Sequence, residues 1–400
     1  MSLYLMMGKR TFIVRTQVYD HGNWRPVYIK VNNGRFSALT ERQVSIVQGS
    51  VDVIDLSTYY LTPGLVDCHV HLAMNAVSLQ GAIDSWADDE AVRMHVAGAL
   101  RQYRDAGVTY VRDGGDAAGI GLMARRMVDE EGLPGPQITA CGHAIYKKGR
   151  YGDFLGPGIA SIEEGFRQID EAVQHTSCLK ICQSGIVSFK TYGHVGAPQF
   201  TLEELTRLIS YAHDKGFLAM VHASGEEAID IAVRAGADTI EHGYFVSTDT
   251  MRRMAEQGTI WVPTLSPLAN LLERPHLLYP GADLEVIKRA VDDHASRIEL
   301  ARDMGMRIAL GTDAGAVGVN HGIPIYEEIE HMVSAGLPRE IVFEMAYREG
   351  RRVIGKPIPR SADSVYGWQV GDVFDAVAYI KDPLKGPVEI GDIAAVYPPT

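Results

Sequence analysis

Cysteine and long hydrophobic runs are both scarce in this sequence. Only four of its 400 residues are cysteines, and they are scattered at Cys68, Cys141, Cys178 and Cys182. So few cysteines exclude a disulfide framework, and we expect a reducing compartment. No apolar run approaches the roughly 18 residues of a membrane span, and the N-terminus lacks the charged segment of a signal peptide. We therefore expect a cytoplasmic protein without a membrane segment.

Positive charge is also scarce. The chain has 38 Lys and Arg residues against 50 Asp and Glu, which gives a net charge of -12. An acidic chain repels phosphate backbones, so nucleic acid is not an expected partner. The sequence has no GxGxxG phosphate loop, which disfavours a dinucleotide-binding sheet. The composition is typical of a globular protein, and the length fits two or three domains, or one large barrel with an appendage.

Both ends of the chain have the pattern of short strands. The segments that alternate apolar and polar residues are 11–20, 26–39, 51–57, 372–382 and 388–399. Asn33 and Gly34 give a turn signal between two of them. We expect no helix before about Asp88, so two β-rich ends flank a different middle.

In the middle, eight apolar strand-like runs alternate with helical patterns. The runs cover 64–72, 108–113, 137–143, 178–185, 217–225, 237–243, 259–264 and 306–315. Eight strand–helix units are the number in a closed (β/α)8 TIM barrel, so the predicted fold class is α/β. An open doubly wound sheet is the alternative, but it usually carries the Gly-rich phosphate loop that is missing here.

Polar residues stand at the ends of these runs, where a barrel places its active site. His69 and His71 end the first run, and the two-residue period of a strand puts both imidazoles on one face, as chelation requires. The later runs carry Lys180, His222, His242 and Asp313. Each residue alone has a structural interpretation, such as a helix N-cap for the aspartate. Six of them at one depth in five strands are hard to attribute to packing.

The other histidines mostly fall on helical or loop segments. These are His95, His175, His213, His294 and His331. We expect them on solvated faces rather than in the site.

The run LTPGLVDCHVHL at 61–72, with the later Lys, two His and the TDAG element, resembles the amidohydrolase superfamily of metal-dependent hydrolases. The resemblance covers nearly the whole chain. It implies a metal-dependent (β/α)8 barrel over residues 61–363, beside a small composite β-sandwich domain built from residues 1–60 and 364–400. The segment 374–384 is similar to the closing segment of that sandwich.

The resemblance also implies a role for each polar residue. His69 and His71 would bind a first metal ion, and His222 and His242 a second. Lys180, as a carbamate, would bridge the two ions. Asp313 would bind the first ion and act as the catalytic proton shuttle.

Physical chemistry is consistent with these roles. Burial can lower a lysine pKa to about 5–6, which leaves a neutral amine able to add CO2. The carbamate has two oxygens that can bridge two ions, and metal binding lowers the pKa of water to roughly 7. Zinc is the default metal for a histidine-rich set. We predict a binuclear hydrolase that attacks an amide, peptide, carbamate or urea bond of a small organic substrate.

Two other functions stay open. In the first, a cyclic-amide hydrolase or deaminase with a single metal ion would leave Lys180 as a bystander. In the second, the protein is a non-enzymatic scaffold, which the presence of all six ligands disfavours. The sequence carries no interface signature, so a homo-oligomer stays open as well.

Within the superfamily, the chain is most similar to the branch of prolidases, carboxypeptidases and imidazolonepropionase-like enzymes. His143 lies in a motif similar to the GGH element of that branch, which implies a catalytic residue that polarises the substrate carbonyl. The run 180–185 resembles the K-x-x-x-x-G strand of the same branch. Ser224 stands where peptidase relatives often have Tyr, and this weakens the case for a dipeptidase.

Two loops, 146–154 and 189–194, mix basic and aromatic residues at the expected rim of the barrel. They could be solvated loops or a pocket for an aromatic or anionic group, with Arg or Lys pairing a carboxylate. The candidate substrate-binding residues are Tyr146, Lys148, Arg150, Lys190, Tyr192 and His321.

Overall fold

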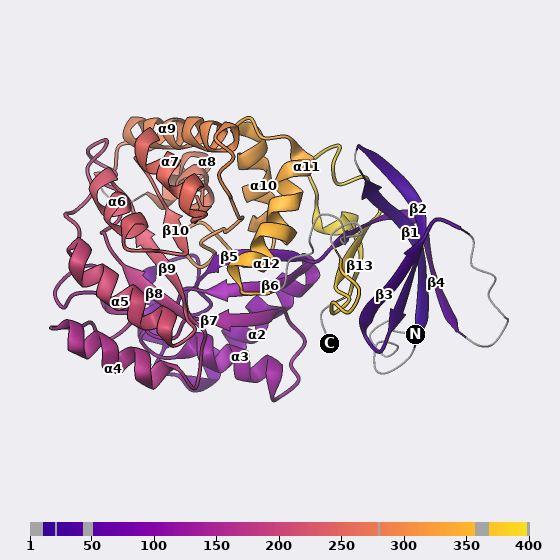
Figure 1. Ribbon diagram of the computed structural model, residues 1–400, viewed down its shortest axis with the longest axis horizontal. Coiled ribbons are helices and arrows are strands. Elements are labelled where there is room, and N and C mark those ends of the chain that lie inside the picture. The colour runs from indigo at the N-terminus through magenta and orange to yellow at the C-terminus, as the bar shows by residue number, and fades with distance from the viewer. Residues whose placement is uncertain (1–10, 21, 43–50, 279–280, 357–367, 398–400) are drawn as a thin grey trace.

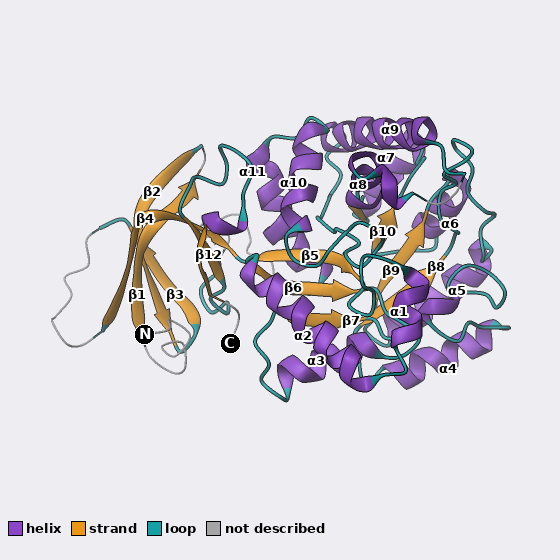
Figure 2. Cartoon of the chain, turned by 180° about the vertical axis from the view of Figure 1, so that it is seen from behind, coloured by secondary structure: helices purple, strands orange, loops and turns teal. Residues whose placement is uncertain are grey.

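The computed structural model of the protein describes residues 11–20, 22–42, 51–278, 281–356 and 368–397. A twisted β-sheet lies beside a larger body of strands and helices (Figure 1). Seen from behind, the strands β5 to β10 of the larger body are surrounded by helices (Figure 2).

The smaller sheet joins both ends of the chain, as the sequence predicts. Its six strands, in spatial order, are β13 (Ile393–Tyr397), β12 (Ala376–Tyr379), β4 (Asp52–Pro63), β1 (Phe12–Asp20), β2 (Asn23–Asn32) and β3 (Arg35–Thr40). Asn33 and Gly34 have φ values of 50° and 71°, so they form the predicted turn between β2 and β3. Alternate residues of the strands, among them Val14 and Ile29, are buried in a core of their own.

This sheet differs from the expected sandwich. The described residues form one six-stranded sheet, and no second sheet facing it is assigned among them. The expected domain boundary at 363/364 lies outside the described residues, and β4 continues to Pro63, beyond the other expected boundary at residue 60. The domain boundaries therefore stay a prediction.

The larger body contains the first seven predicted strand runs as parallel strands. One sheet has the order β5 (Leu65–Val70), β6 (Val108–Asp113) and β7 (Gln137–Ala140). The other has the order β11 (Ile260–Val262), β10 (Thr239–His242), β9 (Leu218–Ala223) and β8 (Cys178–Cys182).

Backbone hydrogen bonds connect the two parallel sheets. The Ile145 amide, just after β7, donates to the carbonyl of Lys180 in β8 at 2.9 Å. The eighth predicted run, 306–315, is not assigned as a strand. It is still hydrogen-bonded to its neighbour, because the Ala309 amide donates to the backbone carbonyl of Trp261 in β11 at 2.9 Å. The Asp313 amide donates to the backbone carbonyl of His69, at the end of β5, at 2.7 Å. The fold is thus TIM-barrel-like and α/β, although no single closed eight-stranded sheet is assigned.

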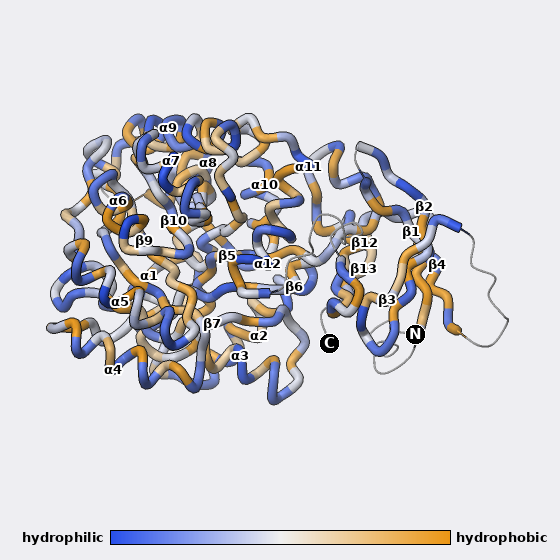
Figure 3. Tube along the Cα trace, in the orientation of Figure 1, coloured by the Kyte–Doolittle hydropathy of each residue, from blue (hydrophilic) through white to orange (hydrophobic). Residues whose placement is uncertain are grey.

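Amphipathic helices cover the parallel strands. They are α1 (Leu79–Ser85), α2 (Asp89–Asp105), α3 (Ile120–Asp129), α4 (Ile162–Ala172), α5 (Leu202–Asp214), α6 (Glu226–Arg234), α7 (Thr248–Gln257), α8 (Ser266–Glu273), α9 (Leu284–Asp303), α10 (Pro324–Ser334), α11 (Arg339–Glu344) and α12 (Gly350–Val353). In α5, Leu205, Leu208, Ile209 and Ala212 are buried at helical spacing, and Thr201 and Glu204 form a capping box. Hydrophobic and hydrophilic residues alternate along α4 and α9 (Figure 3).

Helix α1 contradicts the expectation that no helix precedes Asp88. The Ser78 hydroxyl caps it by accepting a hydrogen bond from the Gly81 amide at 3.1 Å. Only Ala82 of its seven residues is buried, so the apolar periodicity that announces longer helices is missing here.

All four cysteines are buried. Cys141 and Cys178 lie together with Met220, and the Cys141 thiol donates to the Cys178 sulfur at 2.7 Å. Within the described part of the chain, no helix combines the length and hydrophobicity that a bilayer crossing requires. The cytoplasmic location stays a prediction.

Candidate metal centre

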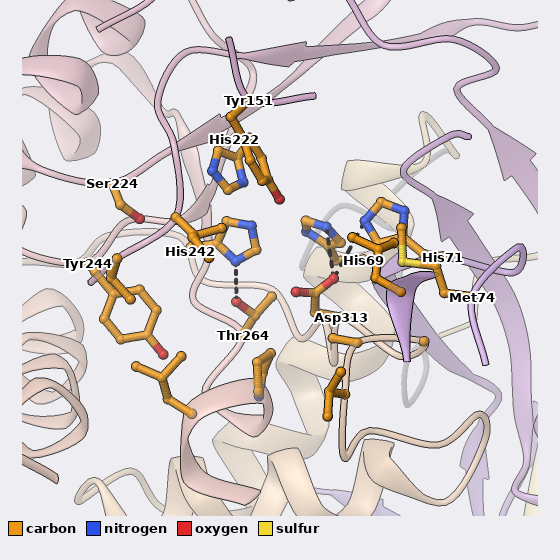
Figure 4. A pocket seen from close by; sticks show the side chains of 18 of the residues that line it. His69, His71, Met74, Tyr151, His222, Ser224, His242, Tyr244, Thr264 and Asp313 are labelled. Atoms are coloured by element: carbon orange, nitrogen blue, oxygen red, sulfur yellow. Dashed lines mark hydrogen bonds and ion pairs between the residues drawn. The ribbon is translucent and has the colours of Figure 1, made fainter. Parts of the chain in front are cut away.

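The six predicted ligand residues line one cavity of about 210 Å³. They are His69, His71, Lys180, His222, His242 and Asp313, and Figure 4 shows the four imidazoles and Asp313 gathered around it. The residues come from β5, β8, β9, β10 and the eighth segment, with Lys180 in the middle of β8 and the others within one residue of a strand's carboxyl end or on the eighth segment. Their convergence follows from the parallel topology, because the carboxyl ends of parallel strands meet at the same rim.

The side chains of His69 and His71 lie on the same face of the chain, as the two-residue period of a strand predicts. The Nε2 atoms of His69 and His71 each lie 3.5 Å from Oδ1 of Asp313. The candidate ligand atoms of His69, His242 and Asp313 all lie within 4.8 Å of one another. This spacing suits donors that share an ion.

Hydrogen bonds fix the tautomer of His69. Its Nδ1 lies 2.7 Å from Glu241, whose other carboxylate oxygen accepts from Arg112 at 2.8 Å. Because Nδ1 donates to the carboxylate, the lone pair of His69 is on Nε2, the atom that faces Asp313. Glu241 and Arg112 are both fully buried. No pattern in the sequence pointed to this pair, because the two residues lie 129 positions apart.

The other imidazoles are oriented in a similar way. Nδ1 of His71 lies 3.2 Å from the carbonyl of Gly115, and Nε2 of His222 lies 3.2 Å from the carbonyl of Gly185. A carbonyl only accepts, so these nitrogens carry the protons and the remaining ring nitrogens can bind a metal. Nδ1 of His242 lies 2.7 Å from the Thr264 hydroxyl.

Burial keeps the imidazoles neutral. It lowers the pKa of His71 and of His222 to about 3, with Lys180 as the next cause. The pKa values of His69 and His242 lie well below the ordinary value for the same main reason. Burial also raises the pKa of Asp313 to about 7. Neutral imidazole is the form that binds metal ions.

Lys180 is buried on β8, and its Nζ lies 3.3 Å from Nε2 of His69. Among the described residues, no carboxylate forms an ion pair with it. An amine buried without an anionic partner is costly in its charged form.

Two site residues have a left-handed backbone. The φ values are 64° for His242 and 55° for Asp313, a conformation that non-glycine residues rarely adopt. Such a residue interrupts the alternation of a strand. Two consecutive residues, Glu241 and His242, can therefore serve one site. Glu241 hydrogen-bonds to the His69 ring, and the centroid of the His242 ring lies 4.9 Å from that of His69.

Glycines make room for the first two histidines. A Cβ on Gly114 would lie 2.7 Å from Cε1 of His71, and one on Gly311 would lie 2.9 Å from Cβ of His69. The imidazoles therefore pack directly against backbone, which restricts their orientation.

His143 does not follow its prediction. Its side chain is exposed and is not among the residues that line the cavity. Strand β7 ends at Ala140, and Gly142 turns the chain with φ of 71° before His143 is reached. The predicted run extended to His143, whereas the strand ends three residues earlier.

None of the six candidate substrate-binding residues lines the cavity. Tyr146 is buried and donates its hydroxyl to Gly156 at 2.9 Å, and Tyr192 packs under the guanidinium of Arg289 at 3.7 Å. Lys148, Arg150 and Lys190 are exposed.

His321 is buried and lies 3.1 Å from the Tyr103 hydroxyl and 3.0 Å from the Met74 carbonyl. It supports the loop after β5 rather than reaching substrate space.

Aromatic residues of the same two loops reach the cavity instead. Tyr151, Phe154 and Phe189 line it, and the Tyr151 ring stacks on His222 at a centroid distance of 5.1 Å. Figure 4 shows Tyr151 beside His222 at the edge of the imidazole cluster. The mixture of basic and aromatic residues predicted that these two loops contribute to the pocket. It did not predict that the aromatic side chains line the cavity and the basic ones do not.

An α/β barrel-like body with histidines, a lysine and an aspartate at its strand ends is characteristic of barrel enzymes. The chain belongs to the amidohydrolase family, whose model matches residues 60–357. This membership confirms the resemblance seen in the sequence and makes the protein a hydrolytic enzyme that acts on C–N bonds. The family is generally metal-dependent, and His69, His242 and Asp313 form a suitable ligand group.

Individual relatives are more distant. An uncharacterized protein of Mycobacterium tuberculosis is 28% identical over 339 residues, which cover 82% of this chain and 81% of the relative. Ochratoxinase of Aspergillus niger is 22% identical over 364 residues, 81% of this chain and 71% of the relative.

Solved structures show the same fold. The A. niger ochratoxinase structure has a TM-score of 0.82 at 17% identity, covering 98% of this chain and 95% of its own. A Xaa-Pro dipeptidase with bound methionine has a TM-score of 0.78 at 24% identity, covering 96% and 99%.

Proposed function

We propose that this protein hydrolyses an amide-like bond of a small organic substrate with the help of two divalent metal ions. The observation that supports this proposal is the convergence of six ligand-type side chains on one cavity. The names of its relatives, ochratoxinase and Xaa-Pro dipeptidase, agree with hydrolysis of such bonds.

The donor set fits divalent ions. It offers four neutral imidazoles, one carboxylate and one buried amine, and nitrogen-rich sets of this kind suit zinc. His69, His71 and Asp313 would hold one ion, and His222 and His242 the other. Lys180 would bridge them as a carbamate, since the added negative charge would remove the cost of its burial without an anionic partner.

When bound, two such ions supply a hydroxide nucleophile at neutral pH and polarise the substrate carbonyl. Asp313 would accept the proton released as the nucleophile forms and return it to the leaving nitrogen. Glu241 and Arg112 would keep His69 in the required tautomer. The apolar cavity wall would exclude bulk water from the reacting groups.

Elemental analysis of protein purified in bicarbonate, without a chelator, tests this proposal. About two ions per chain, together with loss of hydrolysis on chelation and its return on adding metal, are the expected result. A chain that holds no metal would contradict the proposal.

A single-ion enzyme is the second candidate, because among the described residues His69, His242 and Asp313 form a group of three whose ligand atoms all lie within 4.8 Å of one another. It predicts one ion per chain and activity that survives Lys180→Ala. The two-ion proposal predicts that the same substitution removes an ion and abolishes activity.

A further inference from the structure

We propose that the cavity selects uncharged substrates with a hydrophobic group beside the scissile bond and discriminates against substrates with a free carboxylate there. This inference rests on the proposed function, because it names the substrate class of the same site. It concerns the cavity wall outside the candidate metal centre.

That wall is mainly apolar. Leu79, Phe154, Ile186, Phe189, Leu268 and Val317 contribute to it from five separate segments of the chain. Since these residues come from α1, from α8 and from the loops after β7, β8 and the eighth segment, they surround the cavity instead of forming one stripe. A substrate group that extends away from the candidate ligands therefore meets hydrocarbon on several sides.

The wall lacks a cation for a carboxylate. Among the described residues that line the cavity, Lys180 is the only lysine and there is no arginine. Lys180 lies at the base of the imidazole cluster, 3.3 Å from His69, and the proposed function uses it as a ligand. The proposed function also uses the four imidazoles as ligands, so they belong to the candidate metal centre and not to the wall.

Two cationic side chains in neighbouring segments, Lys147 and Arg274, are already engaged. Lys147 lies 2.8 and 2.9 Å from the carboxylate oxygens of Glu204. Arg274 donates to the Gly318 carbonyl at 2.7 Å and to Glu327 at 3.2 Å. A carboxylate in the cavity would have to break one of these pairs to gain Lys147 or Arg274 as a partner.

The physical consequence is selectivity. A carboxylate moved from water to an apolar wall loses hydration and gains no ion pair, whereas an alkyl or aryl group gains from burial. A carboxylate drawn to the ligand cluster would occupy the place that the proposed function gives to the scissile group, so it would not be turned over. Both effects favour the neutral substrate.

A matched pair of amides tests the inference. N-benzoyl-2-phenylethylamine and N-benzoyl-L-phenylalanine differ only in one carboxylate beside the scissile bond. With the metal-loaded full chain, we expect kcat/KM to be about 100-fold higher for the neutral amide, the scale on which a hydrophobic pocket rejects an added polar group. An equal or higher kcat/KM for the carboxylate would overturn the proposal.

Calorimetric binding of the same two compounds separates this inference from the proposed function. Tighter binding of the neutral amide without turnover would support the selectivity and contradict amide hydrolysis. Tighter binding of the carboxylate, or no binding of the neutral amide up to its solubility limit, would overturn the selectivity whatever the turnover.

A variant traces the selectivity to the wall. Ile186 lines the cavity but is 54% exposed, so Ile186→Arg places a cation there without burying it. We expect the preference for the neutral amide to fall at least about 10-fold. The matched control is Met94→Arg, because Met94 is 65% exposed on α2 and does not line the cavity. An unchanged preference in Ile186→Arg, or an equal change in the control, would count against the wall as its source.

Discussion

The chain of contacts behind His69 links single residues to the reactivity of the site. The Glu241 carboxylate accepts a hydrogen bond from Nδ1 of His69. Arg112 forms an ion pair with Glu241 and also donates to the Cys68 carbonyl at 2.7 Å. All of these groups are buried, so the orientation of one imidazole depends on a buried ion pair. Groups that orient a ligand in this way affect metal affinity almost as directly as the ligand.

Glu241→Gln is expected to weaken metal binding by about 10–100-fold, because the amide can still accept from His69 but carries no charge. The measurement is competition with a chromophoric chelator. Glu328→Gln is the matched control. Glu328 is equally buried and accepts from Leu265, Ser266 and the Ser266 hydroxyl, but it does not line the cavity. Equal metal loss in both variants would contradict the role of Glu241.

His294 predicts a dependence of stability on pH. It is buried, stacks on Tyr244 at 3.8 Å, and burial lowers its pKa from 6.5 to about 4. Since the unfolded chain binds this proton more readily, the contribution to stability is complete above pH 6.5 and is lost as pH falls toward 4. Between pH 7 and 4.5 the loss is about 2.5 kcal/mol.

The test compares urea denaturation of the wild type and His294→Gln at both pH values. The variant should lose about 2.5 kcal/mol less than the wild type between pH 7 and 4.5. His175→Gln, at an exposed histidine, is the control and should behave as the wild type does. Parallel losses in all three proteins would show that His294 is not the titrating group.

These residues also mark the limit of prediction from sequence. Strand periodicity identified His69 and His71, because His69 lies on β5 and His71 directly follows its last residue, Val70. His143 failed because its position depends on a turn after the strand, and His294 was expected on a solvated face although it is buried. Tertiary packing decides both outcomes, and a local pattern does not contain it.

At the scale of elements, the strands and long helices were predictable because each carries a repeated apolar pattern. Helix α1 has too few buried residues for such a pattern, and the eighth segment makes hydrogen bonds to neighbours without the regular ladder of a strand. His242 and Asp313 have a left-handed backbone conformation. The type of residue at these positions does not predict this conformation.

Helix α2 offers a test of capping. The Asp88 carboxylate accepts from the amides of Glu90 and Ala91 at 3.1 and 3.0 Å. Asp88→Ala should lower the free energy of unfolding by about 1 kcal/mol, because two amides at the helix start lose their acceptor. Asp89→Ala, one residue later and also exposed, keeps the cap and should cost less. Denaturant titration measures both, and equal losses would contradict a capping role.

At the scale of the whole molecule, a buried ion pair ties the terminal sheet to the barrel-like body. Asp375, next to β12, bonds to the Arg351 guanidinium of α12 and accepts from the Thr109 hydroxyl of β6 at 3.0 Å. Asp375 is fully buried, and Arg351 is 5% exposed. The two ends of the chain are therefore joined to the site-bearing body by charge as well as by hydrophobic contact.

Removing one partner of this pair should be costly. Asp375→Ala leaves the guanidinium buried with only Asp372 at 3.5 Å, and we expect a loss of about 3–5 kcal/mol in urea denaturation. The double variant Arg351→Met with Asp375→Leu removes both charges and should recover most of that loss. A single variant as stable as the wild type would contradict the role of the pair.

The β-rich character of both chain ends was predictable from their alternation of apolar and polar residues, but that the two ends join came from the family resemblance. The expected sandwich came from resemblance, and the described residues give one sheet in its place. Which sheet residues face the larger body depends on contacts such as that between Arg351 and Asp375, which are 24 residues apart and carry no local signal.

The burial of all four cysteines has a practical consequence. Thiol reagents should leave the native protein unmodified and label it only when it unfolds. The four native cysteines would therefore contribute no background to a labelling experiment on the folded protein. A single cysteine placed at Ile186, on the exposed part of the cavity wall, would then be the one reactive position. A fluorophore attached there would report the arrival of a ligand by its change in emission, without any need for turnover.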